Sequence, residues 1–289
     1  MSVKKILLCL DSDPQPSVFD AIVAIDAGVD QVLRHGGVDP SQVRNLVHGA
    51  IFTRGTPQLC HTALFVGGSD VVLSERLAEA AQASFFGPMR VSLMLDPSGA
   101  NTTAAAAMVA ASKHVFLGPE TTAVVLGATG PVGERVVRLL ATEGVRVRVV
   151  SRRLTRASAL CERIAQRAAQ ATLLTAHAMD PGGMESLLDG AQLVVAAGAA
   201  GVPLLTTGDL QAARTLAVAI DLNAVPPPGI GGIEPADRGV LRDGPCCYGA
   251  LGVGGLKMKI HQSAIAHLFT ANDLLLDAEE IYALGKELG

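Results

Sequence analysis

The feature that most restricts what this chain can fold into is a glycine-rich turn at residues 127–133. It lies between a short apolar run, residues 122–126, and a segment whose apolar residues recur at helical spacing over 134–143. A strand that turns tightly into a helix needs glycine where the backbone angles are unusual, and a diphosphate reaches the helix amides only where no side chain intervenes. The pattern predicts a strand, a phosphate-binding turn and a helix, which together open a Rossmann-type nucleotide domain.

The residues of this turn have separate predicted roles. Gly127 and Gly130 allow the unusual backbone angles and the close approach of a diphosphate, and Gly133 lets the helix pack closely on the strand. Proline suits the first helical turn, where its missing amide hydrogen costs nothing, and the Thr129 hydroxyl is placed to bond a phosphate. Ligand-free turns use the same residues, so a purely structural turn is the alternative. The predicted cofactor contacts here are Gly127, Thr129, Gly130, Pro131, Val132 and Gly133.

The residues after the second strand of this domain favour NADP over NAD. A protein that binds NAD usually offers a carboxylate to the ribose about 20 residues beyond the glycines. This chain has Ser151, Arg152 and Arg153 there, and guanidinium groups bond a ribose 2′-phosphate that a carboxylate would repel. A solvated basic loop is the alternative. Further cofactor contacts are assigned at the ends of later strands, to Ala197, Gly198, Asp221 and Asn223, the last two being equally suited to capping the proline turn at 226–228.

Short apolar runs alternate with helical patterns along most of the chain, as is typical of parallel sheets covered by helices. Strands are expected at 6–10, 63–66, 91–95, 122–126, 145–150, 193–197 and 216–222, and helices at 18–27 and 71–83. A flexible glycine-rich run is expected at 248–255, followed by a helix over 258–269. We predict an α/β protein of two domains, in which a Rossmann-type parallel-sheet NADP domain, residues 118–255, is inserted into a second α/β domain, residues 1–117 and 256–289.

Composition and charge exclude several other classes of protein. The net charge of −4 gives no basic surplus for a nucleic-acid backbone, and no run of about 18 apolar residues could span a membrane. The five cysteines and seven histidines show no zinc-like spacing, so we expect buried reduced thiols and no metal. The basic N-terminus precedes a short apolar run that Asp11 ends without a cleavage-like segment. A soluble, cytoplasmic protein is expected.

Seven short segments suggest a family as well as a fold, and several lie outside any generic nucleotide-binding pattern. On these segments the sequence resembles the NADP-dependent methylene-tetrahydromethanopterin and methylene-tetrahydrofolate dehydrogenases of methylotrophic bacteria. The resemblance spans nearly the whole chain. Its segments are PSVFD at 16–20, IFTRG at 51–55, FVGG at 65–68, NTTAAA at 101–106, the glycine turn at 127–133, GIGGI at 229–233 and GALGVGGLK at 249–257.

The resemblance implies that a methylene group bridging two pterin nitrogens is oxidised to the methenyl form, with NADPH as the second product. Loss of hydride leaves a carbocation that both nitrogen lone pairs stabilise, so the step needs no general acid or base and we assign no catalytic residue. The protein must instead align the methylene carbon with the nicotinamide ring and tolerate a developing positive charge. Tetrahydromethanopterin is the favoured substrate, and tetrahydrofolate is left open.

The candidate substrate-binding residues each have a structural alternative. Phe19 is placed to face a pterin ring and Asp20 to accept its ring hydrogens, although a lone phenylalanine is more often core packing. The family resemblance makes Lys257 a pterin-binding or orienting lysine, and a solvated lysine on an amphipathic helix is the alternative; Lys259 is a weaker candidate. The remaining candidates, which are equally suited to capping a helix, are Asn101, Thr102 and Thr103.

Two other functions remain compatible with the residues. One is an NADP-dependent ketone or imine reductase on the same scaffold, which would need no pterin. The other is a non-catalytic NADP-binding sensor, which would transfer no hydride. The resembled enzymes form homo-oligomers, so a homo-oligomer such as a trimer is expected, with no nucleic-acid or membrane partner.

Overall fold

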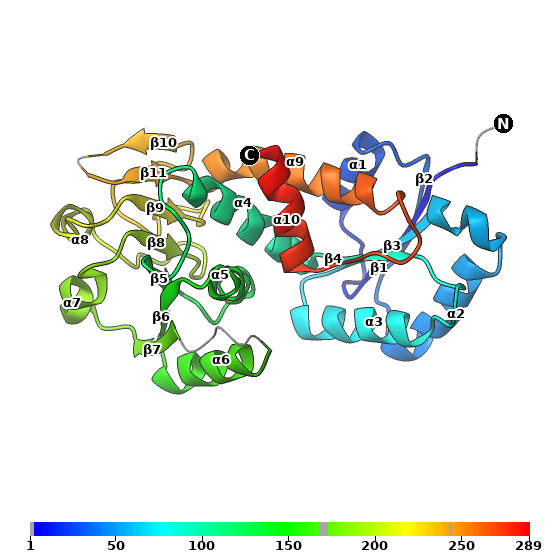
Figure 1. The fold of residues 1–289 in the computed structure, drawn as a ribbon, viewed down its shortest axis with the longest axis horizontal. Coiled ribbons are helices and arrows are strands. Elements are labelled where there is room, and N and C mark those ends of the chain that lie inside the picture. Colours follow the sequence, from blue (N-terminus) through cyan, green and yellow to red (C-terminus); the bar gives the residue numbers. More distant parts are fainter. Residues whose placement is uncertain (1–2, 168–172, 243) are drawn as a thin grey trace. The chain divides into compact units, whose positions relative to one another are not determined.

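The structure, a computed structural model, describes residues 3–167, 173–242 and 244–289 (Figure 1). The chain divides into two units: the first comprises Met1–Thr102 and Met258–Leu288, and the second Thr103–Lys257. The second unit therefore lies, along the sequence, between two segments of the first. Each unit holds its own mainly parallel sheet, which confirms the predicted α/β class. The domain borders expected after residue 117 and before residue 256 stay a prediction.

The first unit is built on a parallel sheet with the strand order β12-β4-β3-β1-β2. Figure 1 shows α2 and α3 on one face of this sheet and α1 on the other. Its elements are β1 (Ile6–Asp11), α1 (Val18–Asp26), β2 (Gln31–His35), α2 (Pro40–Ile51), the 3₁₀ helix η1 (Thr56–His61), β3 (Thr62–Gly67), α3 (Val71–Ala83), β4 (Ser92–Leu95), the 3₁₀ helix η2 (Pro97–Gly99), β12 (Leu275–Leu276) and α10 (Ala278–Leu288).

Local sequence signals explain where the helices of the first unit begin. The Ser17 hydroxyl accepts a hydrogen bond from the Asp20 amide and so starts α1. In α2, Asp39 and Gln42 form a reciprocal capping box around the first turn, with Pro40 at its first position. The apolar faces of α2 and α3 then bury Val43, Val47 and Leu77 against the sheet, and this cluster forms the core of the unit.

The second unit is a Rossmann-type sheet with the strand order β10-β11-β9-β8-β5-β6-β7. Its described strands run parallel except β10, which pairs antiparallel with β11. The elements are β5 (Thr122–Leu126), α5 (Pro131–Thr142), β6 (Arg146–Ser151), α6 (Leu154–Arg167), β7 (Leu174–Ala178), the 3₁₀ helix η4 (Pro181–Gly183), α7 (Met184–Leu188), β8 (Leu193–Ala196), α8 (Thr207–Ala212), β9 (Val218–Asp221), β10 (Arg238–Leu241) and β11 (Cys246–Tyr248).

The strand order of the second unit fixes where a ligand can bind. The chain moves from β5 outward to β6 and β7, and then returns to the opposite side of β5 to form β8. In open α/β sheets this reversal opens a crevice at the carboxyl ends of the two strands beside it. Here those strands are β5 and β8, both almost completely buried, as parallel strands covered on two faces should be.

Two helices carry the chain across the borders of the units, and both correct an expectation. Helix α9 runs over Ala250–His267, so residues 250–255 of the run expected to be flexible at 248–255 are helical instead, and Tyr248 ends β11. A Cβ atom at Gly252 would collide with the carbonyl oxygen of Asp237, and one at Gly249 with that of Glu234. These glycines therefore allow the chain at the start of α9 to pack tightly on the segment before β10, which the sequence pattern alone did not reveal.

Helix α4, which spans Ala100–Ser112, begins one residue before the expected caps. Asn101 and Thr102 lie inside its first turn, so the prediction that one of them caps the helix from outside is wrong. The Asp96 carboxylate caps the helix instead. Its Oδ1 accepts hydrogen bonds from the amides of Asn101 and Thr102 at 2.8 and 3.1 Å. A negative charge at this position also complements the helix dipole.

Among the residues that the structure describes, no helix is both long and apolar enough to cross a membrane.

Candidate functional site

The glycine turn lies at the carboxyl end of β5, at the point where the strand order reverses. Gly127 has a φ of +70°, and a Cβ atom there would lie 2.6 Å from both the Cα and the amide nitrogen of Gly198, which follows β8. A Cβ atom at Gly133 would lie 2.6 Å from the carbonyl oxygen of Gly127. Two backbone segments and the first turn of α5 therefore meet without side chains between them, a close packing that only glycine allows.

The first turn of α5 can hold an anion. Gly130 is the N-cap with an extended backbone and Pro131 is the first helical residue. The N–H groups in the first turn of a helix have no acceptor within the helix, and the helix dipole adds a partial positive charge at this end. Together they suit the diphosphate of a dinucleotide, since its charge would be met by the backbone alone.

Thr129 and Ser151 join the turn to the end of β6. Their hydroxyl oxygens lie 3.1 Å apart, a hydrogen bond in which either can donate. Arg152 and Arg153 follow at once, both exposed, before α6 begins at Leu154. The structure thus brings the predicted phosphate turn and the predicted ribose-phosphate residues to neighbouring strand ends, and the contacts of these residues with a cofactor stay predictions.

Asp221 and Asn223 are buried, and their side chains hold the loop after β9. The Asp221 carboxylate accepts hydrogen bonds from the amides of Asn223 and Ile230, both at 3.0 Å. The Asn223 side chain donates to the carbonyl of Pro227 and accepts from the amide of Val225. Burial raises the pKa of Asp221, and the backbone amides that face its carboxylate oppose that shift. These bonds brace the proline turn, the alternative that the sequence left open.

In the first unit, three aromatic side chains form a cluster in which His261 contacts both Phe65 and Phe19. The ring of His261, on α9, stacks on Phe65 of β3 with 5.8 Å between centroids and an interplanar angle of 20°. The centroid of the Phe19 ring lies 6.1 Å from that of His261, and the two ring planes are inclined by 39°. His261 is completely buried, whereas Phe19 is 46% exposed. Asp20 is beside this group, with its Oδ1 3.9 Å from Nε2 of His261.

The other candidates for substrate binding differ in exposure. Asn101 and Thr102 are completely buried. The Asn101 side chain donates to the carbonyl of Leu95 and to Oδ1 of Asp277, and the Thr102 hydroxyl donates to Asp96. Thr103 and Lys257 are partly exposed. A substrate role for these four residues stays a prediction, and the buried pair already stabilises the start of α4.

Comparison with known proteins identifies the family. The family described as methylene-tetrahydromethanopterin dehydrogenase, N-terminal, matches residues 18–98, and the NmrA-like family matches residues 119–221. The bifunctional protein MdtA of Methylorubrum extorquens is 43% identical over 288 residues, which cover 99% of each chain. The NAD(P)-dependent methylenetetrahydromethanopterin dehydrogenase of the same organism is 30% identical, over 94% of each chain. This chain belongs to the methylene-tetrahydromethanopterin dehydrogenase family. The resemblance stated from the sequence is therefore confirmed.

A solved structure shows the same fold at much greater sequence distance. The ligand-free 5-ketofructose reductase of a Gluconobacter strain aligns over 99% of both chains with a TM-score of 0.53 and 14% identity. At that identity the likeness concerns the fold alone. The assignment to the methylene-tetrahydromethanopterin dehydrogenase family rests on the relatives that share sequence along the full chain.

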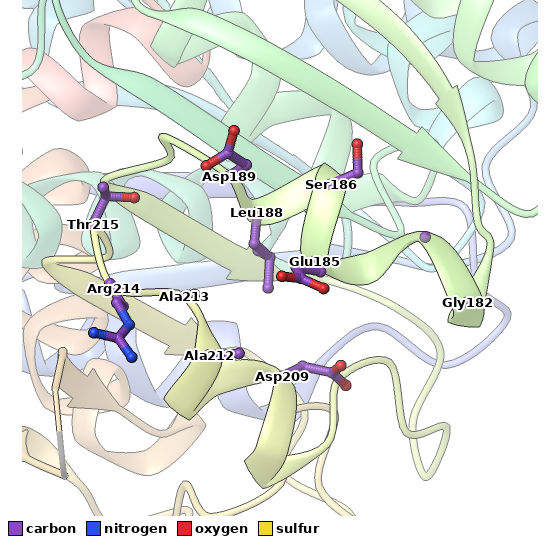
Figure 2. Close-up of a pocket in the computed structure, with 11 residues that line it drawn as sticks. Gly182, Glu185, Ser186, Leu188, Asp189, Asp209, Ala212, Ala213, Arg214 and Thr215 are labelled. Carbon is purple, nitrogen blue, oxygen red and sulfur yellow. The ribbon is translucent and has the colours of Figure 1, made fainter.

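A separate hollow in this family member is a poor nucleotide site. A cavity of about 600 Å³ opens between α7 and α8, and Figure 2 shows the side chains around it. Three of its lining residues, Glu185, Asp189 and Asp209, carry carboxylates that would repel a phosphate. The other described residues that line it are Gly182, Gly183, Ser186, Leu188, Ala212, Ala213, Arg214 and Thr215, and none of the predicted site residues is among them.

The thiols and the metal-binding side chains add no further centre in the described part of this dehydrogenase. All five cysteines are free, and burial raises the pKa of Cys9 to about 12 and of Cys247 to about 11. No group of three histidine, cysteine, aspartate or glutamate side chains could hold a metal ion among residues 3–167, 173–242 and 244–289. Protonated buried thiols are weak nucleophiles and weak metal ligands.

The sequence reasoning missed His261, the residue that joins Phe65, Phe19 and Asp20. One signal was available in this family member's sequence: His261 follows Lys257 by four residues, which places the two on one face of a helix. The signal was weak because a lone histidine in an apolar helix is usually a packed core residue.

Proposed function

We propose that this protein is an NADP-dependent dehydrogenase that oxidises methylene-tetrahydromethanopterin to the methenyl form by direct hydride transfer. The observation that carries the proposal is the 43% identity to MdtA over the full chain, joined to the glycine-rich turn at the strand reversal of the second unit. The 30% identical relative is named for the same reaction, with NAD(P). Methylene-tetrahydrofolate is proposed as a second substrate, since its reacting ring is nearly the same.

The residues at the turn fit a dinucleotide. A Cβ atom on Gly127 or Gly133 would fill the space where backbone segments now meet, so the cradle depends on glycine. We assign the diphosphate to the amides at the start of α5, beside Gly130 and Val132. The ribose 2′-phosphate is assigned to Ser151, Arg152 and Arg153, which lie at the end of β6 with exposed guanidinium groups and a hydroxyl linked to Thr129.

The proposed reaction needs no general acid or base. NADP accepts the hydride, so the methylene carbon gains one positive charge that its two nitrogens share, and no proton moves. The chain must hold the pterin flat against the cofactor and keep water from adding to the methenyl product. We assign ring contact to Phe19 and hydrogen-bond acceptance from the pterin ring to Asp20. Lys257 is assigned to orienting the substrate, because a cation close to the reacting carbon would oppose hydride loss.

The test is a spectroscopic assay of the purified protein. NADP and methylene-tetrahydromethanopterin should give growing absorbance at the NADPH wavelength, and methylene-tetrahydrofolate is then tried in its place. Turnover of simple ketones or imines without a pterin would favour the reductase alternative. Tight NADP binding without hydride transfer to or from either pterin would favour the sensor alternative.

A pair of arginine variants tests the cofactor site itself. Arg152→Glu combined with Arg153→Ala should weaken NADP far more than NAD, by roughly 2 to 4 kcal/mol if charge-assisted phosphate bonds are lost. Arg146→Ala is the matched control, because Arg146 lies at the opposite end of the same strand and donates to the carbonyl of Glu120. Equal weakening of NADP and NAD would show that the phosphate lies elsewhere.

We further propose that the protein acts in the cytoplasm as a homo-oligomer, without a nucleic-acid or membrane partner. Its net charge of −4 supports the absence of nucleic-acid binding.

A further inference from the structure

Helix α1 presents apolar side chains to solvent. Val23 and Ala24, which are 2% and 0% exposed, mark the side of the helix that packs within the first unit. Val18, Ile22 and Ile25 recur at i, i+4 and i+7 on the opposite side, and they are 63%, 57% and 53% exposed. We call these three residues the α1 stripe. A helix with apolar residues on both sides is normally buried on both, so the single chain leaves one side of α1 uncovered.

The α1 stripe has the size and the surroundings of the core of a protein–protein contact. Three side chains that are exposed by half or more present roughly 300 Å² of apolar surface, the size from which the largest patch on a soluble protein is often functional. A stable contact buries about 800 Å² on each partner and surrounds an apolar core with a polar rim. Gln15, before the stripe in the chain, and Asp26, after it, are exposed polar residues that fit such a rim.

We propose that the α1 stripe is a contact surface between copies of this chain. The inference rests on the proposed homo-oligomer and assigns one of its surfaces. The spacing supports a helical contact, because apolar residues at i, i+4 and i+7 form the seam by which one helix packs on another. Valine and isoleucine are branched at Cβ and have few rotamers to lose, so their burial between subunits costs little side-chain entropy. Covering them removes apolar surface from water, which is the main driving force of protein association.

The chemistry of α1 suits a second copy better than a reduced pterin or a membrane. A pterin ring has polar edges that need hydrogen bonds, which branched aliphatic side chains cannot make. Helices that lie on a membrane surface usually carry lysine or arginine on their polar side. Helix α1 has no basic residue, and its two charged residues are Asp20 and Asp26. An anionic lipid surface would therefore repel it.

Self-association, measured by sedimentation equilibrium, tests the stripe. Ile22→Ser removes its central side chain and should raise the dissociation constant at least about tenfold. Ile22 is exposed in the single chain, so the variant should keep the wild-type circular dichroism spectrum. Val72→Ser is the matched control, because Val72 is 58% exposed on α3, on the other face of the sheet (Figure 1). This control should leave the dissociation constant within about twofold of the wild-type value.

Site-specific photo-cross-linking identifies what covers the stripe. A benzophenone amino acid in place of Ile22 should give a covalent product of two chains on illumination. The same amino acid in place of Val72 should give much less of it. Mixing isotope-labelled and unlabelled chains before illumination shows by mass spectrometry whether the joined peptides come from two chains or from one.

Three outcomes would each overturn the proposal. The first is a dissociation constant for Ile22→Ser within about threefold of wild type, well short of the expected loss. The second is a cross-link yield at position 22 no higher than at position 72, and the third is cross-links from position 22 that join only peptides of one chain. An Ile22→Ser protein that associates normally but has a raised KM for the pterin would assign the stripe to the substrate instead.

Failure of the proposed homo-oligomer looks different from failure of this inference. If the wild-type protein sediments as a single chain, both fall together. If the wild type associates and Ile22→Ser associates as tightly, the homo-oligomer stands and only its contact at α1 is wrong.

Discussion

Replacing Gly133 by alanine is the sharpest structural test of the nucleotide cradle. The new Cβ atom would lie 2.6 Å from the carbonyl oxygen of Gly127, and 2.8 Å from the Cα of Ala128. Ordinary carbon contacts lie at about 3.5 to 4.0 Å. Both obstructing atoms belong to the backbone, which cannot rotate away as a side chain would. The first turn of α5 would therefore have to withdraw from β5 by roughly 1 Å.

The size of the effect follows from that displacement. Overpacking of this kind costs about 1 to 3 kcal/mol of folding stability, which for a domain of this size lowers the melting temperature by about 2 to 12 °C. The same withdrawal moves the amides at the start of α5 away from the diphosphate. We expect the Kd for NADP to rise at least about tenfold, which corresponds to about 1.4 kcal/mol.

Gly255→Ala is the matched control, because Gly255 is also a helical glycine. Apart from the backbone of its own helix, no atom of the described residues lies within 4 Å of a Cβ atom at Gly255, and alanine is the better helix former by about 1 kcal/mol. This control should leave the melting temperature unchanged or raise it, with NADP affinity unaffected. Thermal melting followed by circular dichroism and NADP titration by calorimetry measure both quantities. A Gly133→Ala protein with wild-type melting temperature and wild-type NADP affinity would refute the argument.

The remaining predictions concern side chains outside the turn. Asn101→Ala should destabilise the protein by about 2 to 3 kcal/mol in urea titration, because the carbonyl of Leu95 and the carboxylate of Asp277 would each lose a buried donor, at 2.6 and 2.8 Å; a change below about 0.5 kcal/mol would contradict this. The Arg242 guanidinium beside Asp237 lowers the pKa of that carboxyl below its ordinary value of 3.8. The ion pair therefore contributes fully to folding stability above pH 3.8, and its contribution declines as the pH falls below that value. Asp237→Asn should therefore flatten the loss of stability in acid, and an unchanged acid limb in unfolding measurements would be evidence against the pair.

The strands that the sequence predicts well are those buried on both faces. The runs at 63–66, 122–126 and 193–197 become β3, β5 and β8, because a continuous apolar stretch between turn residues has few other solutions in an α/β protein. Strand β2 was not predicted. It lies at the edge of its sheet with most of its residues exposed, so its sequence QVLRH lacks an apolar signal.

The candidate site was predictable where its chemistry lies in the backbone. The backbone roles of Gly127 and Gly133 follow from local spacing, and the positive φ of Gly127 and the tight packing of Gly133 agree with them, while contact with a diphosphate stays a prediction. Contacts made through the fold could not be predicted in the same way. Nothing in the sequence near Asp221 shows that its carboxylate turns inward to the amide of Ile230, and nothing near Phe19 shows that His261 lies beneath it. Such pairs depend on long-range packing, for which one sequence carries no local pattern.

The glycines at the start of helix α9 affect where the protein unfolds locally in solution. Three glycines within its first six residues cost the helix about 2 to 3 kcal/mol relative to alanine, and only Gly252 is pressed against another segment, at the carbonyl of Asp237. Residues 250–255 are therefore stabilised by the contact of Gly252 with the segment at Asp237 more than by their own helical preference. Their amides should exchange with deuterium sooner than those of residues 260–265. Loss of the contact between Gly252 and Asp237, rather than fraying of the helix, should set the rate of this exchange.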